Sequence, residues 1–315
     1  MVGLLGVVSC SSGQQAQQYP VATAKDDNVF VFASFRGNGE DGLHLAYSED
    51  GLIWKALNQD ISILAPKVGG KLMRDPCIIQ GPDGLFHMVW TSSWEEQGIG
   101  IAHSKDLIHW SEQRFIPVMQ DFATAKNAWA PEISWDPDQQ RYIIYWASTL
   151  PGTYPQSEAM ADKGWDHRIY ATTTQDFVTY TPTQLYYQPG FNVIDASIHP
   201  TSDGYVMLLK DETRYPAAKN LYVATSNSMS GPWNKAVAPF SPEGIWVEGP
   251  TLLKTDDWYY VYYDEYTRHQ YGAMRTQDFI HWQNVSDQIQ LPSGTRHGTV
   301  VAISRVQLKA LIDAY

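Results

Sequence analysis

The sequence predicts an all-β fold, specifically a five-bladed β-propeller. Three observations lead to this prediction. A short segment that ends in an aromatic residue recurs five times, an alternating aromatic run precedes most of its copies, and the chain starts and stops partway through one repeat. A period of roughly 50 residues with about four strands is typical of one propeller blade.

The recurring segment has the form of a strand followed by a turn and an aromatic residue. The first copy reads Leu43-His-Leu-Ala-Tyr-Ser-Glu-Asp-Gly-Leu-Ile-Trp54. The closing aromatic residues stand at positions 54, 110, 180, 233 and 282, so successive copies are 56, 70, 53 and 49 residues apart. The copy from Leu221 to Trp233 is the loosest of the five.

The second element is a run in which Tyr, Trp and aliphatic residues alternate, which is typical of half-buried strands. The runs are Val29–Ala33, Phe86–Thr91, Tyr142–Trp146, Tyr205–Leu209 and Trp258–Tyr263. A third element opens each unit, and its copies begin at Asp75, Ala130, Asp195, Gly249 and His297.

The two ends of the chain predict how the ring closes. The chain enters its first unit at Val29 without an opening strand, and it ends soon after the opening strand at His297. We therefore expect residues 29–57 and 297–303 to share one sheet, which leaves no exposed edge. The tail from Val306 to Ala314 looks helical and is expected to cap the outside.

The domain organisation follows from the repeats. Residues 29–315 are expected to form a single propeller, and residues 1–28 a leader and tether. The leader has an apolar run from Met1 to Val8 and a Val-Val-Ser-Cys10 sequence that resembles a bacterial lipobox, although the positive residues of a signal peptide are missing. This predicts a secreted, periplasmic or outer-membrane lipoprotein of a bacterium, attached to the membrane only through a lipid on Cys10.

Composition narrows the class of partner. The chain has 22 Lys and Arg against 34 Asp and Glu, a net charge of −12. An acidic surface repels phosphate backbones, so we expect no nucleic-acid partner. Hydrophobic residues make up 43% of the chain and aromatic residues 13%, which is enough for a large core and for surfaces that stack on sugars. The protein is expected to be a monomer.

Three carboxylates start opening strands in three different units: Asp75, Asp195 and Glu248. The opening strand of a blade lines the central channel, so these side chains are expected to converge at its mouth. A paired carboxylic acid and carboxylate are what cleavage of a glycosidic bond requires. An Asp before Pro is also a common turn residue, so the prediction depends on the set and not on one residue.

The motifs around these carboxylates resemble glycoside hydrolase family 43 over nearly all of residues 29–305. The sequence has Arg74-Asp75-Pro76, Trp129-Ala130-Pro131-Glu132, Ile194-Asp195-Ala196-Ser197, Glu248-Gly249-Pro250 and Arg296-His297-Gly298, in the family order. Ala196 replaces the commoner Pro of the third motif.

The resemblance implies a role for each carboxylate. Asp75 is the expected general base, Glu248 the general acid, and Asp195 the residue that tunes and orients the acid. The family inverts configuration, so a gap of about 6.5–9.5 Å is expected between base and acid. No cofactor is expected to be required. His297 is expected near the channel axis, where a Ca²⁺ ion could be held through water.

Several further residues are candidates for binding the sugar. Trp90 and Trp129 are candidate stacking platforms, with core packing between blades as the alternative. Arg74, Lys210 and Arg296 could reach sugar hydroxyls, with pairing to a channel carboxylate as the alternative. Cys77 is expected to be a packed thiol.

The resulting hypothesis is an inverting, exo-acting α-L-arabinofuranosidase that releases terminal arabinose from side chains of plant polysaccharides. Two polar inserts, 150–167 and 211–220, could wall the channel mouth into a pocket, which favours removal of terminal sugars. A β-xylosidase or exo-galactosidase of the same family is the alternative enzyme. A non-catalytic propeller that only binds glycans is the alternative from another class.

Overall fold

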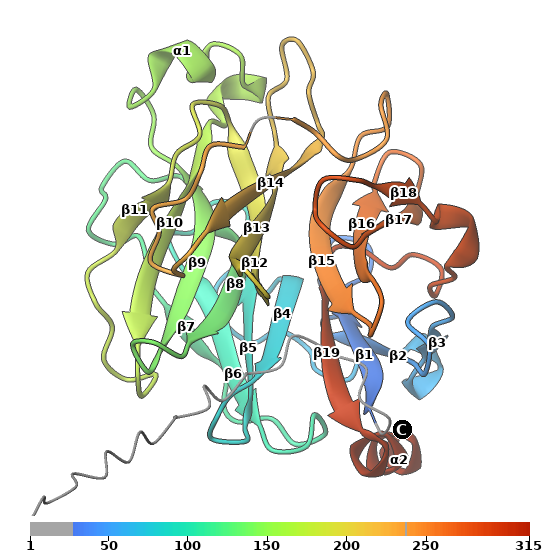
Figure 1. Ribbon diagram of the computed structural model, residues 1–315. Helices are drawn as coiled ribbons and strands as arrows, with labels where there is room; N and C mark the ends of the chain where they lie inside the picture. Colours follow the sequence, from blue (N-terminus) through green and yellow to red (C-terminus); the bar gives the residue numbers. More distant parts are fainter. Residues whose placement is uncertain (1–27, 237) are drawn as a thin grey trace, which may run out of the picture.

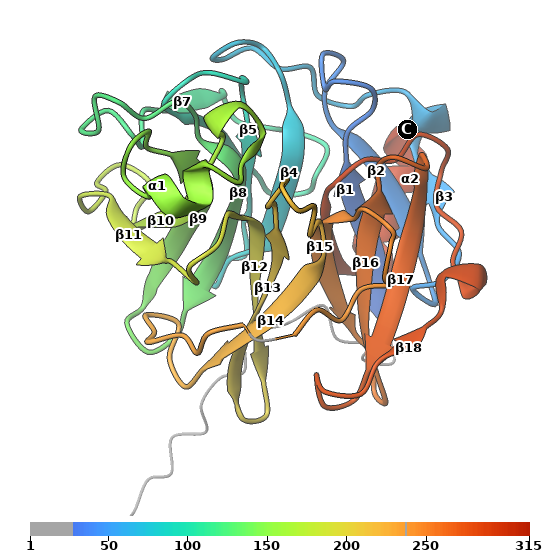
Figure 2. The ribbon, with the colours of Figure 1, turned by 90° about the horizontal axis from the view of Figure 1, so that it is seen from above.

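The computed structural model describes residues 28–236 and 238–315 of the chain. Five antiparallel sheets stand around a common centre like the blades of a propeller, as predicted (Figures 1 and 2). In each blade the innermost strand is the one whose start carries the opening motif of the sequence.

The first three blades have four strands each, named in order from the innermost strand outward. The first blade contains β19 (Thr299–Ser304), β1 (Asn28–Ser34), β2 (His44–Ser48) and β3 (Lys55–Ala56). The second contains β4 (Arg74–Gln80), β5 (Phe86–Thr91), β6 (Ile99–Ser104) and β7 (Arg114–Ile116). The third contains β8 (Trp129–Asp136), β9 (Arg141–Thr149), β10 (His167–Thr174) and β11 (Gln184–Tyr187).

The remaining two blades follow the same order from the innermost strand outward. The fourth contains β12 (Val193–Thr201), β13 (Gly204–Asp211) and β14 (Leu221–Ser226). The fifth contains β15 (Glu248–Lys254), β16 (Tyr259–Glu265), β17 (Gln270–Thr276) and β18 (Gln283–Asn284). The helical segments are short apart from the last: η1 (Asn58–Asp60), α1 (Pro155–Glu158), η2 (Asp162–Gly164), η3 (Ser286–Gln288) and α2 (Arg305–Ala314).

The ring closes through the first blade, which combines the two ends of the described chain. β1 pairs antiparallel with β19, with Val29 opposite Ile303 and Ala33 opposite Thr299. The innermost strands contact one another in the order β4, β8, β12, β15, β19 and back to β4. The predicted sharing of one sheet by the two ends is therefore confirmed, and the ring of blades is closed.

The repeated turn motif has a direct structural cause. In the second blade, Ser104 Oγ accepts the backbone N–H of Leu107 at 2.8 Å, and Asp106 Oδ1 accepts those of Ile108 and His109 at 2.9 and 2.8 Å. Side chains of this kind satisfy backbone donors in tight turns. The same Ser/Thr-x-Asp arrangement recurs at Ser48–Asp50, Thr174–Asp176 and Thr276–Asp278.

The fourth blade differs from the prediction of about four strands per unit, because it has three. Beyond β14 the chain still runs alongside, since Asn234 donates to the carbonyl of Thr225 and Phe240 to that of Leu221, both at 2.9 Å. Pro232 and Pro239 lack the backbone N–H that a strand ladder needs, so this stretch does not form a regular strand.

The C-terminal tail forms the predicted helix, α2. Ser304 and Gln307 form a capping box at its start, and Leu308 and Leu311 pack into the core of the first blade. The leader motif that ends at Cys10 lies outside the described residues, so lipidation stays a prediction. Within the described residues, no helix is long and apolar enough to cross a membrane.

The turn motif generates a stability prediction. Burial acts to raise the pKa of Asp106, but hydrogen bonds from His109 and Ile108 outweigh it and lower the pKa to about 2. We expect Asp106→Ala to lower the free energy of unfolding by about 1 kcal/mol at neutral pH, as loss of a capping side chain does. Urea unfolding measures this difference.

The pH dependence of that difference has a definite sign. A lowered pKa stabilises the fold above the ordinary value of Asp, and the contribution disappears as pH falls through about 2. The gap between Asp106→Ala and wild type should therefore shrink between about pH 4 and pH 2. Glu112→Ala, at an exposed neighbouring position, serves as the control. An equal loss in both variants would contradict this account of the motif.

Candidate active site

The candidate site is created by a β-bulge that four of the five innermost strands share. In each of them one extra residue interrupts the pairing with the next strand, between Arg74 and Cys77, Trp129 and Glu132, Ile194 and Ser197, and Glu248 and Thr251. Bulges bend a strand locally and redirect a side chain, and they are common beside active sites.

The first residue of each bulge has a left-handed backbone conformation. The φ angles are 51° at Asp75, 45° at Ala130, 55° at Asp195 and 59° at Gly249. Three of the bulges place Pro next, where its missing N–H breaks no ladder hydrogen bond. The motif pattern of the sequence is thus the signature of a bulge, and it aims the carboxylates at the channel mouth.

Asp75 is held in place by a hydroxyl from the neighbouring strand. The hydroxyl of Thr91 donates to Asp75 Oδ2 at 2.7 Å and accepts the backbone N–H of Ala130 at 2.8 Å. His297 Nδ1 lies 3.4 Å from Asp75 Oδ1. The carboxylate is fixed through one oxygen, and its side chain remains 12% exposed.

Asp195 is more deeply buried and holds the backbone beside Glu248. Its Oδ2 accepts the N–H of Gly249 at 3.0 Å, and its side chain is only 5% exposed. An added Cβ at Gly249 would lie 2.3 Å from the ring of His297. Glycine is therefore required at position 249 by space as well as by φ.

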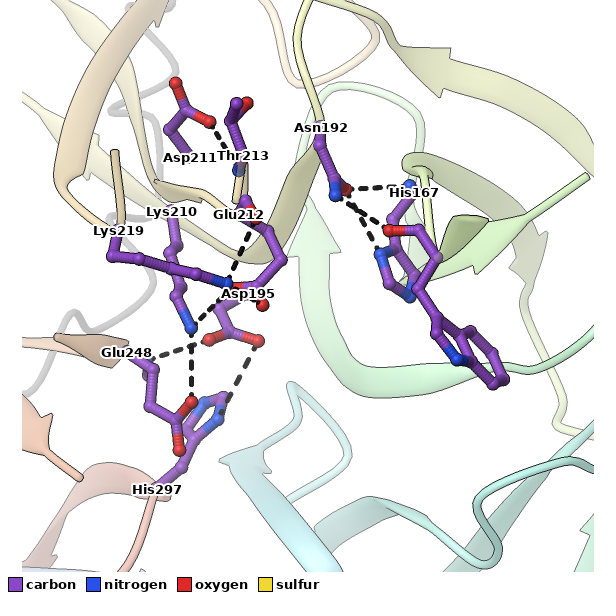
Figure 3. Close-up of polar contacts among 12 residues, drawn as sticks. His167, Asn192, Asp195, Lys210, Asp211, Glu212, Thr213, Lys219, Glu248 and His297 are labelled. Atoms are coloured by element: carbon purple, nitrogen blue, oxygen red, sulfur yellow. Dashed lines mark hydrogen bonds and ion pairs between the residues drawn. The ribbon is translucent and has the colours of Figure 1, made fainter. Parts of the chain in front are cut away.

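Glu248 lies between two cations. Its Oε1 accepts a hydrogen bond from Arg296 at 2.9 Å, and its Oε2 one from Lys210 at 3.2 Å. Lys210 also pairs with Glu212 at 2.6 Å, which in turn pairs with Lys219 (Figure 3). The side chain of Glu248 is 20% exposed, the most accessible of the three carboxylates.

Burial and pairing give the carboxylates different pKa values. Burial raises the pKa of Asp195 to about 6, although His297 and Lys210 oppose it. Burial acts in the same direction on Glu248, but Lys210 and Arg296 outweigh it and hold the pKa of Glu248 below its ordinary value. In the free protein, a proton on this pair therefore resides preferentially on Asp195.

A fourth carboxylate lies beneath the site. Glu132 is buried and accepts a hydrogen bond from the thiol of Cys77 at 3.1 Å, and burial raises the pKa of Glu132 to about 7. Cys77 is a packed thiol, as expected, and burial with the nearby Glu132 raises its pKa well above the usual range.

His297 faces the carboxylates of Asp75 and Asp195. Burial would lower its pKa, but the charges of Asp195 and Asp75 outweigh burial and raise it, which favours the imidazolium. Within the described residues, no group of three or more His, Cys, Asp or Glu could hold a metal ion. A Ca²⁺ ion held through water near His297 stays a prediction.

With this geometry defined, comparison with known proteins identifies the family. Residues 26–309 match a family related to glycoside hydrolase family 43 and described as "Probable glycosyl hydrolase domain". The chain belongs to this family. The resemblance to glycoside hydrolases is therefore confirmed at the level of the family.

Individual relatives of this family 43-related hydrolase are distant. An alpha-L-arabinofuranosidase of Bifidobacterium longum is 20% identical over 298 residues, which cover 80% of this chain and 28% of that protein. The chain thus spans little more than a quarter of its curated relative. Among solved structures, an alpha-L-arabinofuranosidase from Lactobacillus brevis has a TM-score of 0.53 at 20% identity, covering 68% of this chain and 72% of that one.

A family 43 protein from Bacillus licheniformis, solved as a mutant, has a TM-score of 0.55 at 20% identity. The alignment covers 78% of this chain and 47% of that one. At this level of identity, both structural likenesses establish the propeller fold.

The predicted sugar-binding residues of the hydrolase have different outcomes. Trp90 is fully buried against Gly100, so the prediction that it stacks on sugar is wrong and its alternative, core packing, holds. Trp129 is half-buried, and its ring stacks on that of Trp165 with centroids 4.7 Å apart. Trp129 is the first residue of the inner strand β8, and whether it binds sugar stays a prediction.

The three predicted cations are all engaged. Lys210 and Arg296 pair with Glu248, so for these two the alternative of a channel carboxylate as partner holds. Arg74 has other partners, and whether it reaches a sugar hydroxyl stays a prediction. It donates to the side chain of Asn38 at 3.0 Å and lies over the ring of Trp94, 4.3 Å from its centroid.

Sequence reasoning missed three residues that support the site from the second strand of a blade or from the position just after it. Thr91 holds Asp75, Asp264 accepts a hydrogen bond from Arg296 at 2.6 Å, and Glu212 pairs with Lys210. A signal for two of them exists in the sequence. Because these hairpins are antiparallel, the end of each aromatic run must lie beside the start of the opening strand, as Thr91 and Asp264 do.

The two inserts lie against each other, as a wall of the mouth requires. The backbone N–H groups of Arg214 and Tyr215, in the second insert, donate to the carbonyl of Met160 at 3.0 and 2.9 Å. The first insert is also held by Arg168, which is 1% exposed and pairs at 2.8 Å with Asp166, near the end of that insert.

The requirement for glycine at position 249 can be tested with a matched control. Gly249→Ala adds a Cβ that overlaps His297, whereas Gly84→Ala imposes a left-handed alanine, with φ of 79°, in open space. We expect both variants to lose about 1–2 kcal/mol of stability from backbone strain. Only Gly249→Ala should also lose glycosidase activity, by about tenfold or more. Similar activity in both variants would contradict the tight placement of Glu248, Gly249 and His297.

Proposed function

We propose that this hydrolase releases terminal α-L-arabinofuranosyl groups from plant polysaccharide side chains, with inversion of configuration. One observation carries the proposal: three carboxylates from three blades meet with graded accessibility. Glu248 and Asp75 are 20% and 12% exposed, and Asp195 is 5% exposed. The two residues that must reach the substrate are the two more accessible ones.

The choice of sugar draws on the comparisons. The curated relative and one of the solved structures are named alpha-L-arabinofuranosidases. The two inserts are hydrogen-bonded to each other, and a wall that they form at the mouth would suit an enzyme that removes terminal sugars. A β-xylosidase or exo-galactosidase is the alternative. Hydrolysis of nitrophenyl α-L-arabinofuranoside, β-D-xyloside and β-D-galactoside separates these possibilities, and a non-catalytic propeller would turn over none of them.

In the proposed mechanism, Asp75 is the general base. It takes a proton from a water molecule while the oxygen of that water bonds to the anomeric carbon. Glu248 gives its proton to the departing glycosidic oxygen as that bond breaks. The hydroxyl of Thr91 occupies Asp75 Oδ2 and fixes the orientation of the carboxylate. We expect about 6.5–9.5 Å between the carboxyl groups of Asp75 and Glu248, which leaves room for the water.

Asp195 acts through Glu248 and not on the substrate. Its hydrogen bond to the N–H of Gly249 positions the backbone next to the acid. Its negative charge, when present, favours the protonated form of Glu248. Burial of Asp195 is compatible with this supporting role.

The acid must carry its proton in the substrate complex, although pairing favours its ionised form in the free protein. A sugar that fills the mouth removes water from Glu248, which raises the pKa of a carboxyl group.

The same proposal includes secretion of the protein and its attachment to the membrane through a lipid on Cys10, so that it meets the polysaccharide outside the cell. Labelling of the protein with a lipid precursor in a bacterial host tests this part.

Substitution of the two reacting carboxylates gives distinct signatures. Asp75→Asn removes the base and should lower kcat by about 10²–10⁴-fold on natural glycans with little change in binding. Glu248→Gln removes the proton donor, and its loss should be smaller on nitrophenyl glycosides, whose leaving groups need little protonation. A loss below tenfold for Asp75→Asn on natural glycans would remove Asp75 from the role of base.

The pH profile tests the electrostatics of Glu248. The pH dependence of kcat/KM reports the pKa of Glu248 in the free enzyme, so its alkaline limb should lie in the acidic range. The pH dependence of kcat reports the substrate complex, and its alkaline limb should lie at higher pH. Lys210→Met removes a cation that stabilises the carboxylate of Glu248, so the pKa of Glu248 rises and the limb moves up by about one pH unit. Lys254→Met, outside the site, is the control. A limb that moves down or stays in place would contradict the assignment of Glu248 as acid.

A further inference from the structure

Arg214 occupies an unusual position at the rim of the candidate site. It belongs to the insert 211–220, and its guanidinium contacts two aromatic rings, 4.8 Å from the centroid of Trp246 and 5.1 Å from that of Tyr215. Its backbone is fixed by the hydrogen bond to Met160, and Arg214 itself is partly exposed. The side chain is therefore both held in place and within reach of solvent.

A continuous set of contacts connects Arg214 to Glu248. Trp246 stands two residues before Glu248 in the chain and lies 6.3 Å from the ring of Tyr266. Lys210 lies 4.7 Å from the centroid of Tyr266 and hydrogen-bonds Glu248. Arg214 is thus on the Glu248 side of the mouth, where the departing part of the substrate must lie if Glu248 protonates the leaving oxygen.

The other arginines around the mouth, and the two lysines that contact Glu212, have polar partners. These are Arg36 with Asp60, Arg74 with Asn38, Arg168 with Asp166, Lys210 with Glu212 and Glu248, Lys219 with Glu212, and Arg296 with Asp264 and Glu248. Within residues 28–236 and 238–315, the guanidinium of Arg214 has no ion pair and no hydrogen bond. The protein carries 34 acidic residues against 22 basic ones, so an unpaired arginine beside the site is notable.

The geometry points to a binding site for a carboxylate at Arg214. A guanidinium that lies over an aromatic face still presents its N–H groups in its own plane, where they can bind a carboxylate through two hydrogen bonds. We infer that Arg214 binds the carboxylate of a uronic acid in the leaving-group part of the glycan. This inference rests on the proposed function, because the role of Glu248 defines the leaving-group side.

The test compares one polymer in two charge states. The probe is glucuronoarabinoxylan, used as such and after chemical reduction of its carboxyl groups to alcohols. For wild type, reduction should raise KM for arabinose release by about tenfold, the typical contribution of a hydrogen-bonded charge. Arg214→Gln should show equally high KM values on both forms, with unchanged kcat/KM on nitrophenyl α-L-arabinofuranoside.

Arg275→Gln is the matched control, because Arg275 also stacks on a tryptophan, Trp258, and lies near the opposite end of the fifth blade. It should behave as wild type. Equal KM values of wild type on the two polymers, or an Arg214→Gln defect that is the same on nitrophenyl substrate and polymer, would overturn the inference. If wild type hydrolyses none of these substrates, the proposed function fails. Affinity electrophoresis of wild type and Arg214→Gln in the two polymers then still decides whether Arg214 binds the carboxylate.

Discussion

The bulge at the start of the inner strands is the constraint on which the rest of the site depends. A regular strand would point alternate side chains into the two neighbouring blades, where core residues already fill the space. One extra residue with positive φ turns Asp75 and Asp195 toward the channel mouth. A left-handed conformation costs a non-glycine residue about 1–2 kcal/mol. Each strand offsets this cost through the regular pairing that resumes two residues later.

Carboxylates and cations lie close together at the mouth, and burial and ion pairing together determine which carboxyl group is protonated. Glu248 is accessible and lies between Lys210 and Arg296, whereas Asp195 is enclosed and holds a backbone N–H. The two carboxyl groups are chemically similar, yet their environments shift their pKa values in opposite directions. Lys210 also pairs with Glu212, which lies just after the strand that carries Lys210. The insert 211–220 therefore influences the electrostatics of Glu248, in addition to its proposed part in the wall of the mouth.

Much of this could be predicted from the sequence, and the reasons are physical. The number of repeats gives the number of blades, because each blade must bury both faces of its sheet against its neighbours. The way the ring closes follows from the point at which the chain enters the first repeat. Asp75 and Glu248 were recognisable because a bulge leaves a local pattern of Asp or Gly followed by Pro, and Asp195 was recognisable because it opens the corresponding unit of the repeat, although Ala196 follows it. The absence of a fourth strand in the fourth blade could not be predicted, because the repeat is loose there and two prolines cannot donate the backbone hydrogen bonds of a strand.

Side-chain partners were harder to predict. The repeat alone does not say whether Trp90 or Trp129 faces the mouth, because that depends on which neighbour fills the space beside each ring. Lys210 and Arg296 could have faced sugar or carboxylate with the same sequence around them. Arg214 and Trp246 meet only through the packing of an insert, and contacts of that kind depend on tertiary structure, with no local pattern to mark them.

The most direct test of the account is the anomeric form of the sugar that is released first. If Asp75 activates a water molecule opposite Glu248, the reaction is a single displacement and inverts the anomeric centre. Proton NMR of the reaction in its first minutes distinguishes the two anomers before they equilibrate. The account predicts β-L-arabinofuranose as the first product from an α-L-arabinofuranoside. A first product that keeps the α configuration would mean that a carboxylate attacks the sugar directly, and it would contradict the role of Asp75 as general base.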